Sequence, residues 1–403
     1  MKKLLAILMV LTLALSIFTG CGGGSTGSGA ATDTSTDAAD TTDGASSDNV
    51  IKIGVFEPLT GANAGGGELE RQGMELANKL YPEVLGMKVE LVVADNKSDK
   101  AEATTAVARL IEKDNVVAIL GSWGSSLSMA AGDLVQTNQV PAVGASCTNP
   151  QVTLGNDYYF RVCFLDPFQG TVMANYATQR LNAQTAVIVQ EVSNDYSVGL
   201  ASFFKSAFVT LTGDEANILD TLNYNTGDQD FSAIITRIQQ LNPDVVFAPG
   251  NFTESALLIR QAREQGIEIP FIGGDTWETP DFVTVGGEYV EGIVLSTFYD
   301  HTNPTTEIGK IFVDEYRAEY GEDPAAVTAL GFDAYMLVLD AIERAGSADP
   351  VAIRDELAKT VNFEGATGII TIDANGDAEK YEAVIKIVQD GNFVYQDTIE
   401  IAQ

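Results

Sequence analysis

The chain is poor in the residues that carry most enzyme chemistry. Its 403 residues include one histidine, His301, and three cysteines. Zinc sites, Ser-His-Asp triads and Cys-His dyads all depend on these two residue types, so few routes to such centres remain. The composition argues against catalysis. We expect a protein that is not an enzyme and that holds no metal and no cofactor.

Basic residues are also scarce. Lys and Arg together number 23, against 56 Asp and Glu, which gives a formal net charge of −33. A chain this acidic repels the phosphates of nucleic acids and the surfaces of anionic lipids. Most of the charge is expected on a well-solvated surface. Nucleic acid is therefore excluded as an expected partner.

Long apolar runs are missing except at the start, in "MKKLLAILMVLTLALSIFTGC", residues 1–21. Two lysines precede an apolar core that has the length of a signal peptide and is short of the about 20 residues that span a membrane. The stretch "FTGC" resembles the lipobox of bacterial lipoproteins, which implies that Cys21 is lipidated and becomes the new N-terminus. The alternative is a secreted protein that is cleaved nearby.

Residues 22–49 have no large apolar side chain and are rich in Gly, Ser, Thr and Asp. Such a segment cannot bury enough surface to order itself. As a flexible chain it would span roughly 30 Å r.m.s.. We therefore expect a disordered tether, and a protein held outside the cytoplasm on the cell membrane through Cys21.

From residue 50 onward, short β-branched runs alternate with amphipathic stretches of helical period. Apolar runs of this kind predict strands covered on both faces, and the alternating order predicts parallel sheets flanked by helices. We expect an α/β fold of two doubly wound parallel-sheet lobes with a ligand cleft between them. The predicted strands are Ile51–Phe56, Lys88–Ala94, Val116–Leu120, Pro141–Gly144, Ala186–Gln190, Val245–Ala248, Phe271–Gly273, Gly292–Thr297, Gly368–Ile372 and Ala383–Gln389.

Several motifs occur in order along this part: "IKIGVFEPLTG", "VVAILGSWGSS", "PAVGASCTNP", "YYFRVCFLDPFQG", "NDYSVGLA", "DFSAIITRI", "LLIRQAREQG" and "IGGD". Together they make the chain resemble the periplasmic-binding-protein type I group, specifically the branched-chain amino acid binding proteins of ABC importers. The resemblance implies a monomer that closes its lobes around an L-amino acid and presents it to a membrane permease.

The resemblance also implies three crossovers between the lobes. They would fall near Asp166–Gln169, Thr297–His301 and Ile370–Asn375. The N-terminal lobe would then combine 50–168 with 300–370, and the C-terminal lobe 169–299 with 371–403.

The carboxylate of an amino acid needs hydrogen-bond donors. After the strand that ends at Leu120, a helix is expected to start near Ser126, and helix N-termini favour anions. The backbone at Gly124 and the hydroxyl of Ser125 lie in this loop, and Ser125 matches the family's carboxylate-binding serine. Thr148 matches a threonine that helps to bind the same ligand. Ser125 could instead be a plain N-cap, and Thr148 a turn hydroxyl.

The ammonium needs acceptors, because a charge left unpaired in a closed cleft costs several kcal/mol. Asp275 in "IGGD" stands where the branched-chain binders carry a glutamate that pairs with the ammonium. The carbonyl of Ser146 is expected to be a second acceptor. The alternative role for Asp275 is that of an N-cap.

The wall around the ligand side chain departs most from the family. Trp123 stands where an aliphatic residue is common, while Tyr196 matches a pocket tyrosine of the other lobe. Asn251, beside Phe252, replaces a second tyrosine, and three glycines, residues 65–67, replace bulkier residues. A simple leucine pocket is therefore doubtful. Trp123 could also serve only to pack between the lobes.

Two other functions have some support in the sequence. The segment "TGANAGGGE", residues 60–68, links a strand to a helix but lacks the lysine and hydroxyl of a phosphate-binding loop, and Glu68 and Glu70 would repel phosphate. The stronger alternative is a sensor of the same fold, which presents a small amide or another carboxylate ligand to a receptor. The lipid anchor and the lack of an attached signalling domain favour transport.

Overall fold

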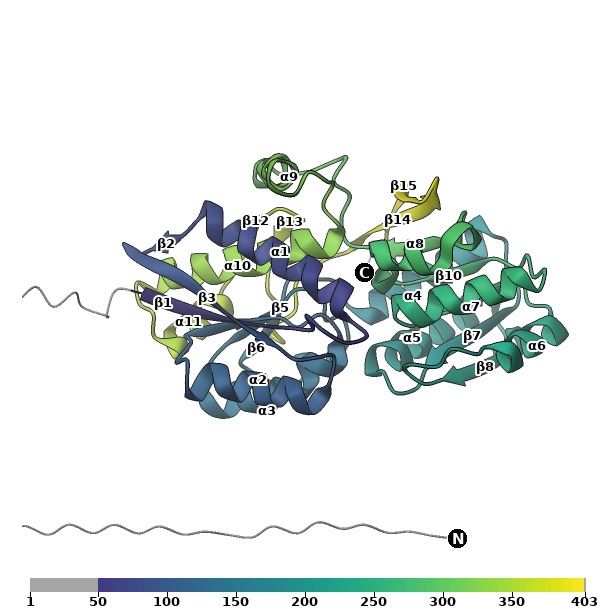
Figure 1. Cartoon of the computed structure of the whole chain (residues 1–403), viewed down its shortest axis with the longest axis horizontal. Helices are drawn as coiled ribbons and strands as arrows, with labels where there is room; N and C mark the ends of the chain where they lie inside the picture. Colours follow the sequence, from purple (N-terminus) through teal and green to yellow (C-terminus); the bar gives the residue numbers. More distant parts are fainter. Residues whose placement is uncertain (1–49, 402–403) are drawn as a thin grey trace, which may run out of the picture. The chain divides into compact units, whose positions relative to one another are not determined.

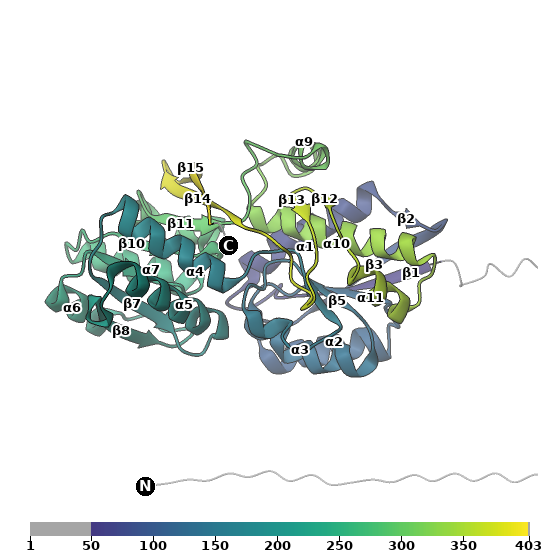
Figure 2. The same cartoon turned by 180° about the vertical axis from the view of Figure 1, so that it is seen from behind.

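Residues 50–401 are described by a computed structural model, in which the chain forms two α/β lobes (Figures 1 and 2). The predicted signal peptide, the lipidation at Cys21 and the tether, which together make up residues 1–49, lie outside the described residues.

The first lobe is built on a six-stranded sheet with the order β2-β3-β1-β4-β5-β6. β1 lies inside the sheet and pairs in parallel with β3 and with β4. Most of its residues are buried, as its near-continuous apolar sequence predicts. The strands are β1 (Val50–Glu57), β2 (Glu83–Val84), β3 (Met87–Asp95), β4 (Ala118–Leu120), β5 (Ala142–Gly144) and β6 (Tyr159–Arg161).

Helices cover both faces of this sheet (Figure 1). α2 and α3 enclose one apolar cluster against the sheet, and α1 and α10 lie on the other side, where they pack on one another. The small sheet of β12 (Phe363–Gly365) and β13 (Gly368–Ile370) contacts this lobe through α9 and α10. The helices are α1 (Ala64–Leu80), α2 (Lys100–Glu112), α3 (Ser125–Asn138), α9 (Glu307–Tyr320), α10 (Ala326–Ala345) and α11 (Pro350–Leu357).

The second lobe has a seven-stranded sheet with the order β15-β14-β11-β10-β9-β7-β8. Its strands are β7 (Ala186–Glu191), β8 (Ile218–Tyr224), β9 (Val245–Phe247), β10 (Phe271–Gly273), β11 (Val294–Thr297), β14 (Glu382–Gln389) and β15 (Asn392–Glu400). Its helices are α4 (Asp166–Asn175), α5 (Asp195–Thr212), α6 (Ser232–Leu241), α7 (Phe252–Glu264) and α8 (Pro280–Gly286).

The fold of two α/β lobes with doubly wound parallel sheets, predicted from the sequence, is confirmed, and antiparallel pairs occur only at the edges of the two large sheets. β2 pairs antiparallel with β3, and β14 pairs antiparallel with both β11 and β15. The sequence prediction also missed β2, β6, β8, β12 and β15. The sequences of β8 and β15 lack a long apolar run because these strands are half-buried or exposed at the sheet edge.

The lobe boundaries stay a proposal, and strand membership supports most of them. β6 ends at Arg161 in the first sheet, whereas α4 packs on α5 in the second lobe. Residues 371–378 still contact the first lobe, because the Arg161 N–H donates to Gly376 O at 3.0 Å and the Arg161 side chain pairs with Asp377. We therefore propose that the third crossover lies after residue 378, later than Ile370–Asn375.

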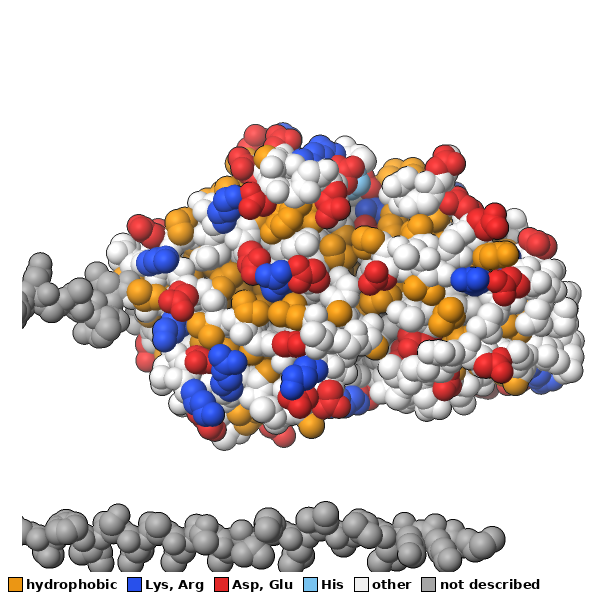
Figure 3. Space-filling model, viewed as in Figure 1, with side chains coloured by type: hydrophobic (Ala, Val, Ile, Leu, Met, Phe, Trp, Pro, Cys, Tyr) orange, Lys and Arg blue, Asp and Glu red, His pale blue; other side chains and the backbone are white. Residues whose placement is uncertain are grey.

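Acidic side chains are spread among basic and apolar ones over the face drawn in Figure 3, as expected for a solvated charge. Cys147 and Cys163 are buried free thiols. Within residues 50–401, no helix has the length and apolar character needed to cross a membrane.

α1 and α10 approach one another closely through glycines. A Cβ added at Gly73 would lie 1.9 Å from the Thr328 carbonyl oxygen, and one at Gly331 would lie 2.3 Å from the Glu70 carbonyl oxygen. Real Cβ atoms do not come this close to a carbonyl oxygen. Only glycine therefore fits at either position unless the helices move apart. This contact fixes the position of α1 relative to the rest of the first lobe.

Replacement of Gly73 by alanine is expected to lower the free energy of unfolding by about 1–3 kcal/mol, because the helices must separate. Gly132→Ala in α3 is the control. Its Cβ would meet only an Asn156 side-chain nitrogen, at 3.3 Å, and alanine is the better helix former. Urea unfolding measures both variants, and equal midpoints would contradict the prediction.

Candidate functional site

A small cavity lies between the lobes, at the carboxyl ends of β4, β5 and β10, with a volume of about 10 Å³. This is where doubly wound sheets place their ligands. Seven of the nine residues predicted to bind the ligand line it, and Thr276 joins them. The lining residues are Trp123, Gly124, Ser125, Ser146, Tyr196, Asn251, Asp275 and Thr276.

On one side of the cavity, α3 begins at Ser125. Gly124 precedes it with φ 91°, a left-handed conformation that favours glycine. The N–H groups of Leu127 and Ser128 donate to Gly124 O, which leaves those of Ser125 and Ser126 as the leading donors of the helix. Ser125 is not the N-cap, and its hydroxyl accepts a 3.2 Å bond from the Asn149 N–H. The N-cap alternative for Ser125 is therefore wrong.

Thr148 is not among the residues that line the cavity. It is fully buried, and its hydroxyl lies next to the carboxyl group of Asp166 at the start of α4. The Asp166 N–H also donates to Thr148 O at 3.0 Å. Burial raises the pKa of Asp166 to about 8, and the nearby Asp275 adds to this rise. In this structure Thr148 therefore faces the junction between the lobes.

On the opposite side, Asp275 is buried in the turn Asp275–Trp277 that follows β10. Gln169 Nε2 donates to its Oδ1 at 2.7 Å and Tyr196 OH donates to the same atom at 2.9 Å. The carboxylate of Asp275 accepts from these two side chains and caps no helix. The N-cap alternative is therefore wrong. Burial raises the pKa of Asp275 to about 6, although its two donors lower it.

Trp123 lines the cavity and also packs between the lobes. Its side chain is almost fully buried, and its ring meets Phe252 of the second lobe edge-on, with centroids 6.0 Å apart. A Cβ at Gly66 would lie 2.3 Å from ring atom Cε2. Trp123, which is larger than the usual residue, and the glycines, which are smaller than the usual residues, are thus one feature. The indole occupies the space that the absent side chain of Gly66 leaves.

Asn251 uses its side chain for contacts within the protein. Its Nδ2 donates to Asn63 Oδ1 of the first lobe at 2.8 Å, and its Oδ1 accepts from Asn194 Nδ2 at 3.1 Å. Both ends of the amide are therefore engaged. Phe252, the next residue, contacts Trp123 and is not a lining residue.

At the rim of the cleft, Asp195 connects the lobes. Its Oδ2 accepts from Lys100 Nζ at 2.7 Å and from Ser126 Oγ at 2.8 Å. Its carbonyl accepts from Asn149 Nδ2 at 2.9 Å. The lobes are therefore in the closed arrangement, which explains the small volume of the cavity.

Two buried glutamates beneath the cavity were not predicted as part of the site. Glu57 at the end of β1 accepts a 2.7 Å bond from the Trp123 N–H, and Glu70 in α1 accepts one from the Ser146 hydroxyl. Burial raises the pKa of Glu57, and it raises that of Glu70 to about 8. One feature of the sequence could have indicated Glu70. It is an acidic residue on the buried face of a helix, between Gly67 and Met74.

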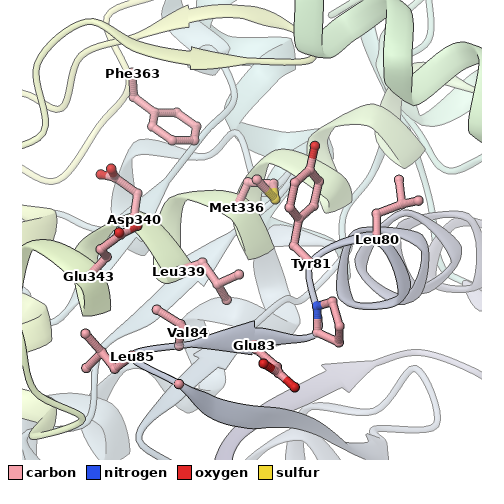
Figure 4. A pocket seen from close by; sticks show the side chains of 12 residues that line it. Leu80, Tyr81, Glu83, Val84, Leu85, Met336, Leu339, Asp340, Glu343 and Phe363 are labelled. Atoms are coloured by element: carbon pink, nitrogen blue, oxygen red, sulfur yellow. The ribbon is translucent and has the colours of Figure 1, made fainter.

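A larger pocket of about 650 Å³ lies elsewhere on the first lobe, where the β2–β3 turn faces α10 (Figure 4). Its charged residues are all acidic: Glu83, Asp340 and Glu343. It offers no counterpart to the donors and the acid that face each other across the cleft. In the described part of the chain, no group of three or more His, Cys, Asp or Glu could hold a metal ion. The cleft is therefore the candidate site.

Comparison with known proteins agrees with this geometry. A model of the family described as periplasmic binding protein matches residues 50–392. The chain belongs to the periplasmic binding protein family. Among curated relatives in the family, a leucine-, isoleucine-, valine-, threonine- and alanine-binding protein of Pseudomonas aeruginosa is 28% identical over 343 residues, or 84% of this chain and 89% of its own.

Two solved structures of this family are similar throughout. A leucine-binding protein from Thermotoga maritima has a TM-score of 0.84 and 43% identity, with 87% of this chain and 99% of its own covered. A branched-chain amino acid transporter substrate-binding protein from Streptococcus pneumoniae, in complex with isoleucine, has a TM-score of 0.82 and 31% identity, with 87% and 100% covered. The resemblance to branched-chain amino acid binding proteins of ABC importers is confirmed.

Proposed function

We propose that this protein captures an L-amino acid outside the cytoplasm and delivers it to the permease of an ABC importer. One observation carries the proposal: the start of α3 at Ser125 and the carboxyl group of Asp275 face the same small cavity from different lobes. A zwitterion needs this pairing of donors and an acid across a short distance. Lobe closure brings the two together.

The energetics divide the roles of these groups. A hydrogen bond to a charged group contributes about 1.5–3 kcal/mol, and burial of a leucine-sized side chain contributes about as much in total. Micromolar affinity needs roughly 8 kcal/mol after the costs of ordering. The contacts to the carboxylate and the ammonium, through Ser125, Ser146 and Asp275, must therefore supply most of the affinity, while the side-chain wall selects the amino acid.

The small size of the cavity and the indole of Trp123 favour an aliphatic side chain over an aromatic one. The relatives described as binding leucine, isoleucine, valine, threonine or alanine support the same class. We also propose that the protein is a monomer held on the cell membrane by a lipid on Cys21, with residues 22–49 as its tether.

Calorimetry with all common L-amino acids tests the proposal, and native mass spectrometry of the purified protein identifies any retained ligand. At least one aliphatic L-amino acid is expected to bind with micromolar or tighter affinity, and its D-enantiomer much more weakly. Absence of heat from every L-amino acid would contradict the proposal. Co-purification with a permease pair, as opposed to a receptor, tests the delivery step.

A further inference from the structure

Glu57 and Glu70 form a carboxyl pair directly behind the cavity wall. Both side chains are fully buried, and each lies within hydrogen-bonding reach of the other. One oxygen of each, Glu57 Oε1 and Glu70 Oε2, has no donor among the described residues. The other oxygens accept from the Trp123 N–H and from Ser146 Oγ, and both Trp123 and Ser146 line the cavity.

Among residues 50–401, the surroundings of the pair supply no neutralising cation. Asp275 faces Glu70 from the turn after β10, and it is an acid. The thiols of Cys147 and Cys163 and the phenol of Tyr159 also face the pair, and all three are neutral when protonated. Arg161, which lies near Cys147, forms an ion pair with Asp377 at 2.6 Å.

Two carboxylates in such contact cannot both be ionised in a buried site, because their repulsion adds to the cost of desolvation. At least one proton must therefore stay on the pair, and it provides the donor that the two free oxygens lack. Ser146 connects the pair to the cavity. Its hydroxyl donates to Glu70, and Ser146 lines the same cavity as Asp275, the expected partner of the ligand ammonium.

We propose that Glu57 and Glu70 are both protonated while the cleft is empty, and that the ammonium of an amino acid bound at Asp275 displaces the proton of Glu70 to solvent, so that one proton stays shared between the two carboxyl groups. The inference rests on the proposed function. One carboxyl O–H bond breaks, its proton passes to the buffer, and the ammonium keeps all its protons. Glu70 acts through Ser146 and is a positioning residue that supplies a second negative charge to the bound ammonium.

The direction of the pH dependence follows from the order of the two acids. Asp275, with a pKa of about 6, is largely ionised at neutral pH, whereas Glu70, with a pKa of about 8, is largely protonated. An incoming cation lowers the pKa of Glu70, so binding releases a proton between that lower value and about 8. Affinity therefore rises with pH in this window, by up to about tenfold per pH unit, and levels off above pH 8.

Calorimetry in phosphate and in Tris at pH 7, with L-alanine, L-valine, L-leucine and L-isoleucine, measures the released proton from the difference in heat. We expect release of about half a proton to one proton by the amino acid that binds most tightly, and an affinity that increases about three- to tenfold from pH 6 to pH 8. Binding without proton release, with a flat pH profile, would overturn the inference and leave the proposed function intact.

Variants identify the source of the proton. Glu70→Gln is expected to abolish the release and flatten the pH profile, and Glu57→Gln is expected to do the same. Asp166→Asn is the matched control, because Asp166 is an equally buried acid near Asp275 with a pKa of about 8. Release that disappears in Asp166→Asn and persists in Glu70→Gln would overturn the assignment.

A second measurement does not depend on a ligand. The infrared carbonyl band of a protonated carboxyl group in the empty wild-type protein at pH 7 is expected to weaken in Glu70→Gln. An unchanged band would overturn the protonation of Glu70 even if no amino acid binds, and failure to bind any amino acid would by itself count only against the proposed function.

Discussion

Replacement of Asp275 by alanine is expected to weaken L-amino acid binding at least tenfold, and by up to about a thousandfold. The substitution leaves the ligand ammonium in a closed cleft without its nearest acid, and the loss of one partner of a buried charge pair costs about 3–5 kcal/mol. It also removes the acceptor of Gln169 Nε2 and Tyr196 OH. Calorimetry at pH 7 measures the change.

The control for this variant is Asp220→Ala. Asp220 lies on β8, at the far edge of the same sheet, and pairs there with Arg237 at 2.8 Å. A partly exposed pair of this kind contributes little, so affinity should stay within about twofold of wild type. Tyr196→Phe, which removes one donor to Asp275, should have an intermediate effect. Unchanged affinity in Asp275→Ala would mean that another acid accepts the ammonium.

Trp123 is expected to decide which amino acid binds, and Gly66 is expected to hold it in place. Gly66→Ala puts a Cβ within 2.3–2.6 Å of three ring atoms, so the indole must move. We expect a loss of about 1–3 kcal/mol in the free energy of unfolding and at least tenfold weaker binding. Trp123→Ala should lower stability by about 3–5 kcal/mol and favour larger ligand side chains.

The double variant tests whether the two residues act together. Without the ring, the added Cβ of Gly66→Ala has nothing there to displace, so its effect should largely vanish in the Trp123→Ala background. A double-mutant cycle on stability, read from urea unfolding, should give a coupling of about 1–3 kcal/mol. Additive effects would contradict the contact. A ligand panel on Trp123→Ala that keeps the wild-type order of affinities would remove Trp123 as the selecting residue.

Local patterns were sufficient for the fold class and for much of the site. Strands such as β1 and β7 are covered on both faces, so they are apolar almost throughout. Such a run predicts a buried parallel strand even when the neighbouring strands are not known. The loop after β4 was placed correctly because it follows such a strand. The motifs that match the family gave Asp275 and Tyr196, which lie in the other lobe and share no local pattern with that loop.

Edges and reversals were harder. β15 alternates between half-buried and exposed residues and pairs only with β14, so it lacks the apolar run that marks an inner strand. The direction of β14 depends on its partners and leaves no trace in its own residues. Asn251 lines the cavity as predicted, but only the structure shows that its amide also joins the lobes through Asn63 and accepts from Asn194 within its own lobe.

The sequence by itself determined the α/β lobes, the scarcity of histidine and cysteine for catalysis, and the neutral donors and single acid that suit a zwitterion. Only the tertiary structure decided that Trp123 fills the space above Gly66, and that Glu57 and Glu70 meet behind the cavity wall. The reason is physical. The charge of a segment and the period of its apolar residues can be read from that segment alone. A shared proton and the space left by a missing Cβ depend on contacts between residues of different elements.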